Sequence, residues 1–429
     1  IRSQLSRTPI RSRDALNRSR GVAAEELRRH NLATVIEFLH LSGPRSRSEL
    51  AAATGLNRST IADLIGELVG LGLTDEGPGV AAAGPGRPSP VVSTRPAGAV
   101  VLAIEISVDS VAVAAVGLGG HVYNSLRVAR PRGRFSPQET VREVSGLAQP
   151  ILAALPPNHV LVGVGAGVAG VTRRSDGFVH LAPNLGWRNV PLGALLSTEL
   201  GLSRQVLVAN EADLGALAEY RRGVGSGVGH LVYISGEAGI GAGIIQDGKP
   251  MLGSAGYAGE AGHMLINPNG HTCRCGFIGC WETEAGEAAL ARHAGIPGSV
   301  AGLGILDTVM TRASGGDRRT IDAIAEIGHW LGLGIGNLVN VFNPELVLLG
   351  GFYHALFPFL EDSVVDGARL RALQAPGDGL LIARSGLGAD APLTGAAELA
   401  FTDLIADPAA LPGRQIEIAP VGGRAGAKR

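Results

Sequence analysis

The feature that most constrains the fold is a series of Val/Ala/Gly-rich segments that alternate with helical patterns after Pro96. The segments AVVLAIEISVDSVAVAAVG (99–117) and HVLVGVGAGVAGV (159–171) predict buried strands. The segment RQVLVANEADLGALAEYRRG (204–223) predicts a strand followed by a helix. This alternation predicts an α/β fold with ligand sites at strand ends. Because the chain has 429 residues, a pair of such lobes is expected.

The composition supports a globular protein with an aliphatic core. Hydrophobic residues make up 45% of the chain but aromatic residues only 4%, so Ala, Val, Leu and Ile must fill the core. No apolar run reaches the roughly 18 residues of a membrane helix. The charged N-terminal stretch is followed by no apolar segment that would suggest a signal peptide. We therefore expect a cytoplasmic protein without a membrane partner.

The N-terminal region predicts a basic arm followed by a helical module. The first twenty residues carry six arginines and one aspartate, which predicts a solvated, flexible arm over residues 1–24. A first helix is expected from apolar residues at helical spacing, namely Leu27, Leu32, Val35, Ile36 and Leu39. Ser46 and Glu49 have the spacing of a capping box that opens a second helix, which ends at Gly55.

A third helix, capped by Asn57, has the pattern of a DNA-recognition helix. Its inward face is Ile61, Leu64, Ile65, Leu68 and Leu71. Its exposed start offers Asn57, Arg58, Ser59 and Thr60 to bases and phosphates. A Gly/Pro-rich hairpin follows with Arg87 at its tip, which is suited to a minor groove. Residues 25–95 thus predict a winged helix-turn-helix domain; the alternative is a three-helix packing unit without DNA.

All three cysteines lie in one short stretch, HTCRCGFIGCWE (271–282). They are Cys273, Cys275 and Cys280. The odd number and tight spacing disfavour disulfide bonds and favour a metal site or a redox pair. The redox alternative is the weaker one, because CxC is not the CxxC of a redox motif.

The segment YAGEAGHMLINPNGHTCRCGFIGCWETEAG (257–286) resembles the signature of the ROK family, which joins bacterial sugar kinases and sugar-responsive repressors. Four further blocks resemble that family in the expected order: APNLGW, ANEADLGALAE, NPELVLLGG and APLTGAAELA. The resemblance implies a two-lobed actin-like (ribonuclease H-like) sugar kinase fold over residues 96–405, with a zinc motif in 263–282. The preceding winged module resembles the transcriptional-regulator branch, which includes xylose- and N-acetylglucosamine-type repressors. Residues 406–429 are expected to form a flexible tail.

The resemblance also implies a structural metal site. Three thiolates and one imidazole supply the four ligands of a closed tetrahedral zinc site, one per chain. His263 and His271 are the two histidines near the cysteines. The family pattern selects His263, whereas His271 lies only two residues from Cys273 and would strain the loop.

The resemblance further implies a sugar pocket. Glu260, His263 and Glu282 match the family's contacts to sugar hydroxyls, and Asn184 and Asn210 match further contacts. Carboxylates and amides suit polyol recognition, because their oxygens accept hydrogen bonds from hydroxyl groups. For any one of these residues alone, a capping or surface role is the alternative.

Substitutions at three sites, namely the catalytic-base position and the two phosphate loops, argue against kinase chemistry. Glu211 stands where the family's kinases carry a catalytic Asp, and its extra methylene displaces the base although it can still bind a sugar. In the first phosphate loop, EISVD, Glu105, Val108 and Asp109 replace key residues. In the second loop, EAGIGAG, Glu237 adds an acid and Ala238 removes a hydroxyl. We expect no ATP binding and no catalytic residue.

The sequence therefore predicts a sugar-responsive, DNA-binding transcriptional regulator, most simply a repressor released by a monosaccharide. A homodimer or tetramer on a palindromic operator is expected, because one winged module buries little DNA surface. The alternatives are an ATP-dependent sugar kinase with an added DNA-binding domain, and a regulator that responds to a phosphotransferase protein.

Overall fold

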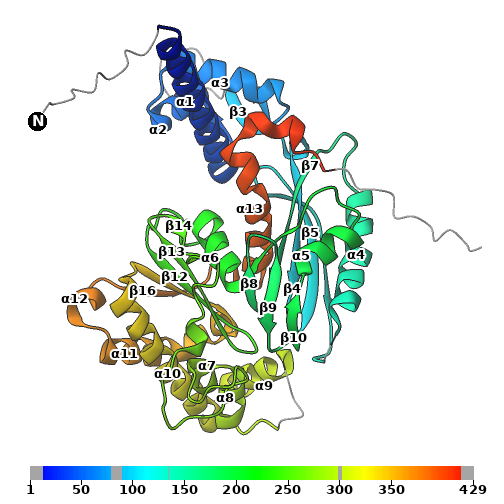
Figure 1. Ribbon diagram of the computed structural model, residues 1–429. Helices are drawn as coiled ribbons and strands as arrows, with labels where there is room; N and C mark the ends of the chain where they lie inside the picture. Colours follow the sequence, from blue (N-terminus) through cyan, green and yellow to red (C-terminus); the bar gives the residue numbers. More distant parts are fainter. Residues whose placement is uncertain (1–12, 79–88, 134, 298–301, 417–429) are drawn as a thin grey trace, which may run out of the picture. The chain divides into compact units, whose positions relative to one another are not determined.

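The computed structural model describes residues 13–78, 89–133, 135–297 and 302–416 (Figure 1). The chain divides into two compact units. Unit 1 runs to Ala99 and also includes Leu118–Gly120 and Thr402–Gln415, and unit 2 contains the rest. Within the described residues, no helix is both long and apolar enough to cross a membrane.

Unit 1 has the element order of a winged helix-turn-helix. Three helices are followed by two strands, β2 and β3, that pair with each other. A short strand between the first two helices, β1, pairs with β3, so the sheet order is β1-β3-β2. The helices are α1 (Arg13–Ser42), α2 (Arg47–Thr54) and α3 (Arg58–Gly70), and the strands are β1 (Arg45–Ser46), β2 (Thr74–Gly77) and β3 (Val91–Thr94). All three strands are antiparallel to their neighbours. A 3-10 turn, η1 (Pro96–Gly98), follows the sheet.

The predicted capping signals of α2 and α3 are confirmed. The Ser46 hydroxyl accepts from the Glu49 N–H at 3.2 Å, and the Glu49 carboxylate accepts from the Ser46 N–H at 2.7 Å. Gly55 ends α2 with a φ of 70°, a left-handed conformation that favours glycine. Asn57 caps α3 by accepting from the Thr60 N–H at 2.8 Å. Local sequence therefore sets both helix starts and the turn between them.

The core of unit 1 agrees with the predicted apolar faces except at Leu27 and at Leu71, which follows the end of α3 and is only half-buried. The side chains of Leu32, Val35, Ile36 and Leu39 in α1 and of Ile61, Leu64, Ile65 and Leu68 in α3 are buried. Leu27 is 61% exposed, so its assignment to the inward face is wrong. The helix also begins at Arg13, inside the predicted flexible arm, because residues 13–24 are mostly good helix formers. Residues 1–12 and Arg87 lie outside the described residues.

Unit 1 includes two segments from distant parts of the chain that the sequence did not predict. In the turn Leu118–Gly120, Leu118 is fully buried and the Gly119 N–H donates to His40 Nδ1 at 2.9 Å. The other segment contains the 3-10 helix η4 (Pro408–Gly413), with Leu411 buried. The predicted flexible tail is therefore wrong for residues 406–416, because their apolar side chains find partners. Residues 417–429 lie outside the described residues.

Unit 2 contains two five-stranded sheets with the same topology, each the centre of one lobe (Figure 1). In lobe A the order is β11-β7-β4-β5-β6, and in lobe B it is β14-β13-β12-β15-β16. In each sheet three consecutive strands pair antiparallel and two further strands pair parallel. The repeated order confirms the predicted two-lobed α/β fold. The strands of lobe A are β4 (Val100–Ile106), β5 (Ser110–Gly117), β6 (His121–Ala129), β7 (Leu161–Val168) and β11 (Leu207–Asn210); those of lobe B are β12 (Leu231–Gly236), β13 (Ile240–Gln246), β14 (Lys249–Pro250), β15 (Leu346–Gly351) and β16 (Leu381–Arg384).

Helices pack closely on both sheets, and glycine permits the closest approach. A Cβ on Gly165 of β7 would overlap the carbonyl oxygen of Ala396 in helix α13 (Ala391–Ala406), so this helix lies directly on the strand. A smaller antiparallel sheet in lobe A consists of β8 (Val171–Arg173), β9 (Phe178–Ala182) and β10 (Trp187–Val190). The remaining helices are α4 (Pro137–Ala153), α5 (Leu192–Glu199), α6 (Glu211–Arg222), η2 (Ala261–His263), α7 (Trp281–Ala285), α8 (Glu287–His293), α9 (Leu303–Ser314), α10 (Arg318–Phe342), α11 (Phe352–Arg371), α12 (Gln374–Gly377), η3 (Gly388–Asp390) and α13 (Ala391–Ala406).

We expect Ser46→Ala to lower the free energy of unfolding of unit 1 by about 1 kcal/mol, because the α2 N-terminus loses its side-chain cap. Urea unfolding followed by far-ultraviolet circular dichroism measures the change. Ser42→Ala is the control, because Ser42 is exposed at the end of α1 and lies outside α2. Equal stabilities of the two variants would contradict the capping role.

Candidate functional site

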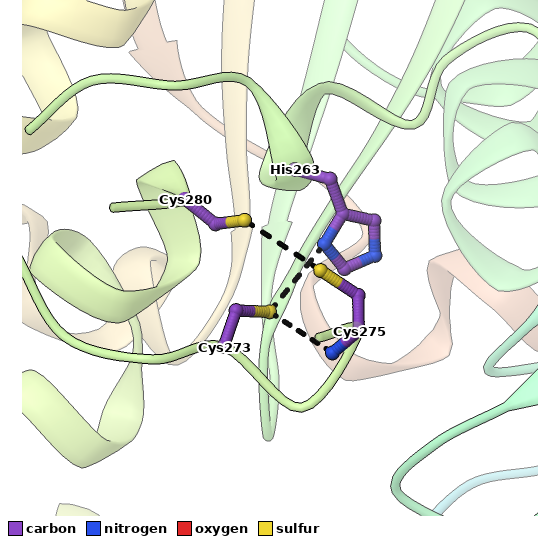
Figure 2. Close-up of side chains that lie close together, drawn as sticks. All are labelled: His263, Cys273, Cys275 and Cys280. Atoms are coloured by element: carbon purple, nitrogen blue, oxygen red, sulfur yellow. Dashed lines mark hydrogen bonds between the residues drawn. The ribbon is translucent and has the colours of Figure 1, made fainter. Parts of the chain in front are cut away.

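One His and three Cys side chains converge in lobe B (Figure 2). The ligand atoms of His263, Cys273, Cys275 and Cys280, here called the metal cluster, all lie within 4.8 Å of one another. Cys273 Sγ is 3.7 Å from His263 Nδ1, and Cys275 Sγ is 3.7 Å from Cys280 Sγ. The cluster could hold a metal ion.

The geometry of the cluster fits a tetrahedral site. Zinc–sulfur bonds of about 2.3 Å place two ligands of a tetrahedron roughly 3.8 Å apart. The two 3.7 Å separations agree with that edge. His271 is exposed and is not part of the cluster, as the family pattern indicated. The four donors therefore suit a closed site that needs no further ligand.

A buried tryptophan anchors the end of the cysteine loop. Trp281 is fully buried, and its indole N–H donates to the carbonyl of Trp330 in α10 at 2.9 Å. A Cβ on Gly334 of the same helix would overlap the indole ring. The ring therefore packs directly on the backbone of α10. Because Cys280 and Glu282 flank Trp281 in the chain, this contact fixes both.

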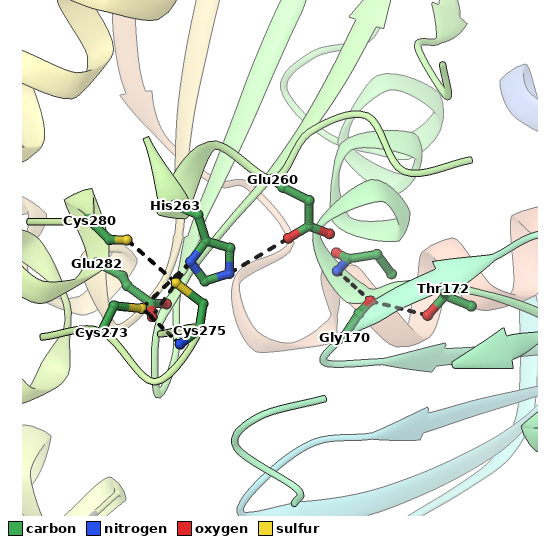
Figure 3. Close-up of polar contacts among 9 residues, drawn as sticks. Gly170, Thr172, Glu260, His263, Cys273, Cys275, Cys280 and Glu282 are labelled. Carbon is green, nitrogen blue, oxygen red and sulfur yellow. Dashed lines mark hydrogen bonds and ion pairs between the residues drawn. The ribbon is translucent and has the colours of Figure 1, made fainter. Parts of the chain in front are cut away.

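His263 and Glu282 connect the metal cluster to a pocket (Figure 3). His263 Nδ1 faces Cys273, while His263 Nε2 lies 4.0 Å from a carboxylate oxygen of Glu260. Glu282 accepts a hydrogen bond from the Cys273 thiol at 2.9 Å. Burial, followed by this hydrogen bond, raises the pKa of the Cys273 thiol. The two ring nitrogens of His263 thus point to different places, one to the cysteines and one toward the pocket.

The pocket beside the cluster, here called the ligand pocket, is lined from both lobes. Figure 3 shows Glu260 and His263 on one side and Gly170, which follows β7, on the other. The sequence predicted six polar side chains for a sugar site, and all six line this pocket: Asn184, Asn210, Glu211, Glu260, His263 and Glu282. They are far apart in the sequence, so the fold brings them together.

The two asparagines of the ligand pocket also have structural partners. Asn210 caps α6, because its Oδ1 accepts from the Ala212 N–H at 2.7 Å while its Nδ2 donates to the Gly170 carbonyl at 3.0 Å. Asn184 Oδ1 accepts from Arg274 at 2.5 Å. The capping role considered from the sequence is therefore real for Asn210. Each amide keeps further hydrogen-bonding capacity for a ligand.

A second and larger cavity, about 400 Å³, lies beside the ligand pocket and is here called the acidic cavity. Its lining includes Glu105, Ser107 and Asp109 of the first altered phosphate loop. Of the second loop it includes only Glu237, because residues 238–242 line the ligand pocket. Glu211 and Glu237 line both cavities and so lie where the two meet. Val108 lines the ligand pocket, whereas its neighbours Ser107 and Asp109 line the acidic cavity. Five acids line the acidic cavity: Glu105, Asp109, Glu211, Glu237 and Glu287.

Two arginines that the sequence did not single out neutralise part of this acidity. Arg127 of β6 donates to both carboxylate oxygens of Glu105, at 2.9 and 3.2 Å. Arg132 donates to both oxygens of Asp109, at 2.6 and 2.9 Å, and to Glu287 at 2.5 Å. Since Glu287 belongs to lobe B and Asp109 to lobe A, Arg132 joins the two lobes. The members of these ion pairs are far apart in the sequence. Their opposite charges are the only sequence signal that could have predicted the pairing.

Glu211 and Glu237 experience a strongly negative, desolvated environment. Burial raises the pKa of Glu211 well above its ordinary value, and the charges of Glu237 and Glu105 raise it further. Burial, with the charges of Glu105 and Asp109, raises the pKa of Glu237 to about 8. Among the described residues, neither side chain has a hydrogen bond or ion-pair partner in the structure.

The predicted DNA-contact residues lie together at the start of α3 in unit 1. Asn57, Arg58 and Ser59 are exposed, and Thr60 is half-buried. Within the described part of the chain, Arg58 forms no ion pair. Farther along α3, Glu67 accepts from Arg28 at 2.6 Å, so this acid is neutralised. The start of α3 therefore presents polar and positively charged groups to solvent.

Comparison with known proteins identifies one family over most of the chain. Residues 101–403 match the model of the ROK family. The xylose repressor of Caldicellulosiruptor bescii is 33% identical over 73% of this chain and 81% of its own length. The xylose repressor of Bacillus subtilis strain 168 is 29% identical over 87% of this chain and 96% of its own length.

Solved structures agree with these sequence relatives. A ROK family transcriptional regulator, described as a homolog of the E. coli MLC protein, aligns with a TM-score of 0.71 and 28% identity over 90% of this chain and 97% of its own. A ROK family glucokinase from Streptomyces griseus, solved with glucose and AMPPNP, aligns with a TM-score of 0.60 and 28% identity over 70% of this chain and 99% of its own. The kinase leaves a larger part of this chain unmatched than the regulator does.

We expect Glu237→Gln to stabilise the protein increasingly as the pH rises from about 5 to about 8. In the folded state the pKa of Glu237 is raised from 4.5 to about 8, so folding takes up a proton in this window and the wild type loses stability with rising pH. The free energy of unfolding of the variant, relative to that of the wild type, should rise by at most about 1.4 kcal/mol per pH unit in this window. Above pH 8 the difference should stay constant.

Thermal unfolding of wild type and variant across this pH range measures the difference. Glu361→Gln is the control, because Glu361 is exposed on α11 and lines neither cavity. A difference in melting temperature between Glu237→Gln and the wild type that is the same at every pH would contradict the raised pKa of Glu237. The charged groups that act on Glu237 are Glu105, Asp109, Glu287 and Arg132.

Proposed function

Because the chain belongs to the ROK family, we propose that it is a sugar-responsive transcriptional repressor that binds DNA through unit 1 and its effector through unit 2. The observation that carries the proposal is the combination, in one chain, of a unit with the element order of a winged helix-turn-helix and a pocket lined by carboxylate, amide and imidazole side chains. Such a protein acts where the chromosome is, so the proposal places it in the cytoplasm.

The chemistry of the ligand pocket supports a monosaccharide effector. Carboxylate oxygens of Glu260 and Glu282 accept hydrogen bonds, and the amides of Asn184 and Asn210 both accept and donate them. A sugar hydroxyl needs both kinds of partner, and an unpaired buried polar group is costly. Gly239 permits the close packing of this wall, because a Cβ there would overlap the Glu282 carboxylate. The six polar side chains of the pocket thus form the proposed sugar-binding set.

The first turn of α3 supports operator binding. Exposed Arg58 is free of internal ion pairs in the described residues, so it can contact a phosphate or base. Asn57 is held by its capping bond, which fixes the start of the helix. One such module buries too little DNA surface for strong specificity, which supports a homodimer or tetramer on two symmetric half-sites.

The acidic cavity supports regulation over phosphoryl transfer. A nucleotide triphosphate requires cations or backbone N–H groups along its phosphates. Here the two arginines of the cavity already pair with Glu105, Asp109 and Glu287. Glu211 occupies the position of the catalytic base, but its pKa lies well above its ordinary value, which leaves less of the basic form at neutral pH. The alternative function is that of the ROK kinases, namely ATP-dependent phosphorylation of a sugar.

The metal cluster fits zinc with a structural role. The ion would be held by the four residues of the metal cluster, namely His263, Cys273, Cys275 and Cys280. It would cross-link the loop, and because all four coordination positions are filled by protein, none would be open to a substrate. Because His263 also faces Glu260, the ion would orient the imidazole that lines the ligand pocket. The loop between His263 and Glu282 would then be rigid on the side where the sugar binds.

The proposed mechanism is thermodynamic linkage between the two units. A sugar contacted by side chains of both lobes stabilises their closed arrangement. The closed arrangement changes the geometry of the paired DNA-binding modules and lowers their affinity for the operator. Because linkage is reciprocal, operator DNA must weaken sugar binding by the same factor.

We expect the purified protein to bind DNA from upstream of its own gene and one common monosaccharide to release it. A sugar at 100 times its dissociation constant stabilises the protein by about 2.7 kcal/mol, which a thermal-shift panel detects. Fluorescence anisotropy with labelled DNA then measures release. Arg58→Ala should weaken DNA binding about tenfold, the effect of one phosphate contact.

Arg142→Ala is the control for that variant, because it removes an exposed arginine from unit 2 without touching α3. Equal DNA affinity of Arg58→Ala and Arg142→Ala would contradict the assignment of α3. Sustained ADP formation with ATP and any sugar of the panel would replace the repressor by a kinase.

We expect the isolated protein to contain about one zinc ion per chain, and Cys275→Ala and His263→Ala to contain almost none. Elemental analysis by mass spectrometry measures the content, and thermal unfolding should show a lower melting temperature for both variants. His271→Ala is the matched control and should keep its zinc. A zinc loss in His271→Ala with retention in His263→Ala would overturn the ligand assignment.

A further inference from the structure

The acidic cavity has two carboxylates without a positively charged partner. Its arginines pair with three of its five acids, which are Glu105, Asp109 and Glu287. Within the residues that the structure describes, the other two, Glu211 and Glu237, receive no side-chain hydrogen bond or ion pair. We propose that this cavity binds an organic monoamine, with its ammonium group at Glu211 and Glu237 and its apolar body in the rest of the cavity. This role goes beyond the sugar response proposed above.

Glu211 is the buried acid that most clearly lacks a partner. Its side chain lies where the two cavities meet, and the residue is only 9% exposed. It is the first residue of α6, but the cap of this helix is supplied by the side chain of Asn210. Buried polar side chains are nearly always hydrogen-bonded, because an unpartnered one is costly. A cationic ligand in the cavity would supply the partner that the described residues do not.

The electrostatics of the two acids couple cation binding to proton release. The charged groups that act on the pair are Glu105, Asp109, Glu287 and Arg132. Burial and the negative charges raise the pKa of Glu211 well above its ordinary value and that of Glu237 to about 8. Without a ligand, Glu237 is therefore mostly protonated at neutral pH. An ammonium group beside the two acids stabilises their charged forms, so its binding should release a proton.

A metal ion is the other cation that acids can hold, and the spacing of these side chains disfavours it. In the described parts of the chain, the group of His, Cys, Asp or Glu side chains close enough to share one ion is the metal cluster, and no three acids of the acidic cavity form such a group. Hard divalent ions such as Ca²⁺ require many oxygen ligands at short distance. An ammonium group needs only acceptors for its N–H groups, which two carboxylates provide.

The rest of the cavity suits an apolar body. The apolar side chains that line it from α8, α9 and α11 are Leu290, Ile305, Leu306 and Phe352. The volume of about 400 Å³ falls in the range of small-molecule sites, roughly 300 to 1,000 Å³. An apolar group on this wall leaves water, which is favourable. A second ammonium group would meet the same wall, or acids that already pair with arginine, so a monoamine fits better than a polyamine.

The test is isothermal titration calorimetry of the full-length protein with phenethylamine at about pH 8.5, where the amine is still charged and Glu237 is mostly ionised. The neutral match is 2-phenylethanol, which has the same ring and chain, and spermidine is the polyamine. We expect phenethylamine to bind more tightly than either by about tenfold or more, because hydrogen bonds between charged groups are the stronger ones. Lowering the pH from about 7.5 to about 6.5 should weaken phenethylamine binding by roughly tenfold, because one proton must be displaced.

Two kinds of variant locate the amine in the cavity. Glu237→Gln and Glu211→Gln should each weaken phenethylamine binding by about tenfold and leave 2-phenylethanol binding unchanged, because glutamine keeps the size of the side chain but not its charge. Leu306→Ala should instead weaken both compounds by a similar factor, because it removes part of the apolar wall. Glu361→Gln, outside both cavities, should change neither. If Glu211→Gln does not fold, Glu237→Gln decides.

Four results would overturn the proposal. Phenethylamine that does not bind, or that binds no more tightly than 2-phenylethanol, would leave at most an apolar site. Tighter binding of spermidine would contradict a monoamine. Displacement of phenethylamine by magnesium chloride, at equal ionic strength, would assign the two acids to a metal ion. Unchanged phenethylamine affinity in the Gln variants would place the amine elsewhere on the protein.

Discussion

The packing of Trp281 on the backbone of α10 is the constraint on which the site depends. The indole ring fits only because Gly334 has no side chain, and its N–H is satisfied by the Trp330 carbonyl. Cys280 precedes the ring and faces the metal cluster, whereas Glu282 follows it and lines the ligand pocket. A single buried side chain in the core of lobe B thus sets the position of one residue of the metal cluster and one residue of the ligand pocket.

The charge of the acidic cavity is the opposite of what a nucleotide needs. The cavity is lined from both lobes, and its acids include Glu105, Asp109 and Glu237. Arg127 and Arg132 compensate part of this charge by pairing with acids and not with a ligand. Such internal pairing stabilises the cavity without making it a nucleotide site. The bridge from Asp109 through Arg132 to Glu287 also makes the separation of the lobes electrostatically unfavourable.

Much of the fold and site could be predicted from the sequence because the relevant signals are local. The capping box at Ser46, the left-handed turn at Gly55 and the strand-helix alternation each depend on a few adjacent residues. The six polar residues of the ligand pocket and the four of the metal cluster were instead predicted from the resemblance of separate blocks to the ROK family. Leu27 failed because an apolar residue at helical spacing is buried only if another element covers it. Arg132 was missed because its partners Asp109 and Glu287 are distant in sequence and carry no motif that includes it.

Unit 1 is discontinuous in sequence, since it combines the first 99 residues with Leu118–Gly120 and Thr402–Gln415. The chain therefore passes between the units several times. The turn between β5 and β6 belongs to unit 1 although both strands belong to unit 2, and α13 begins in unit 2 and ends in unit 1. A fragment that stops at residue 99 would lose Leu118 and Leu411 from its core, so unit 1 cannot be excised as one continuous piece.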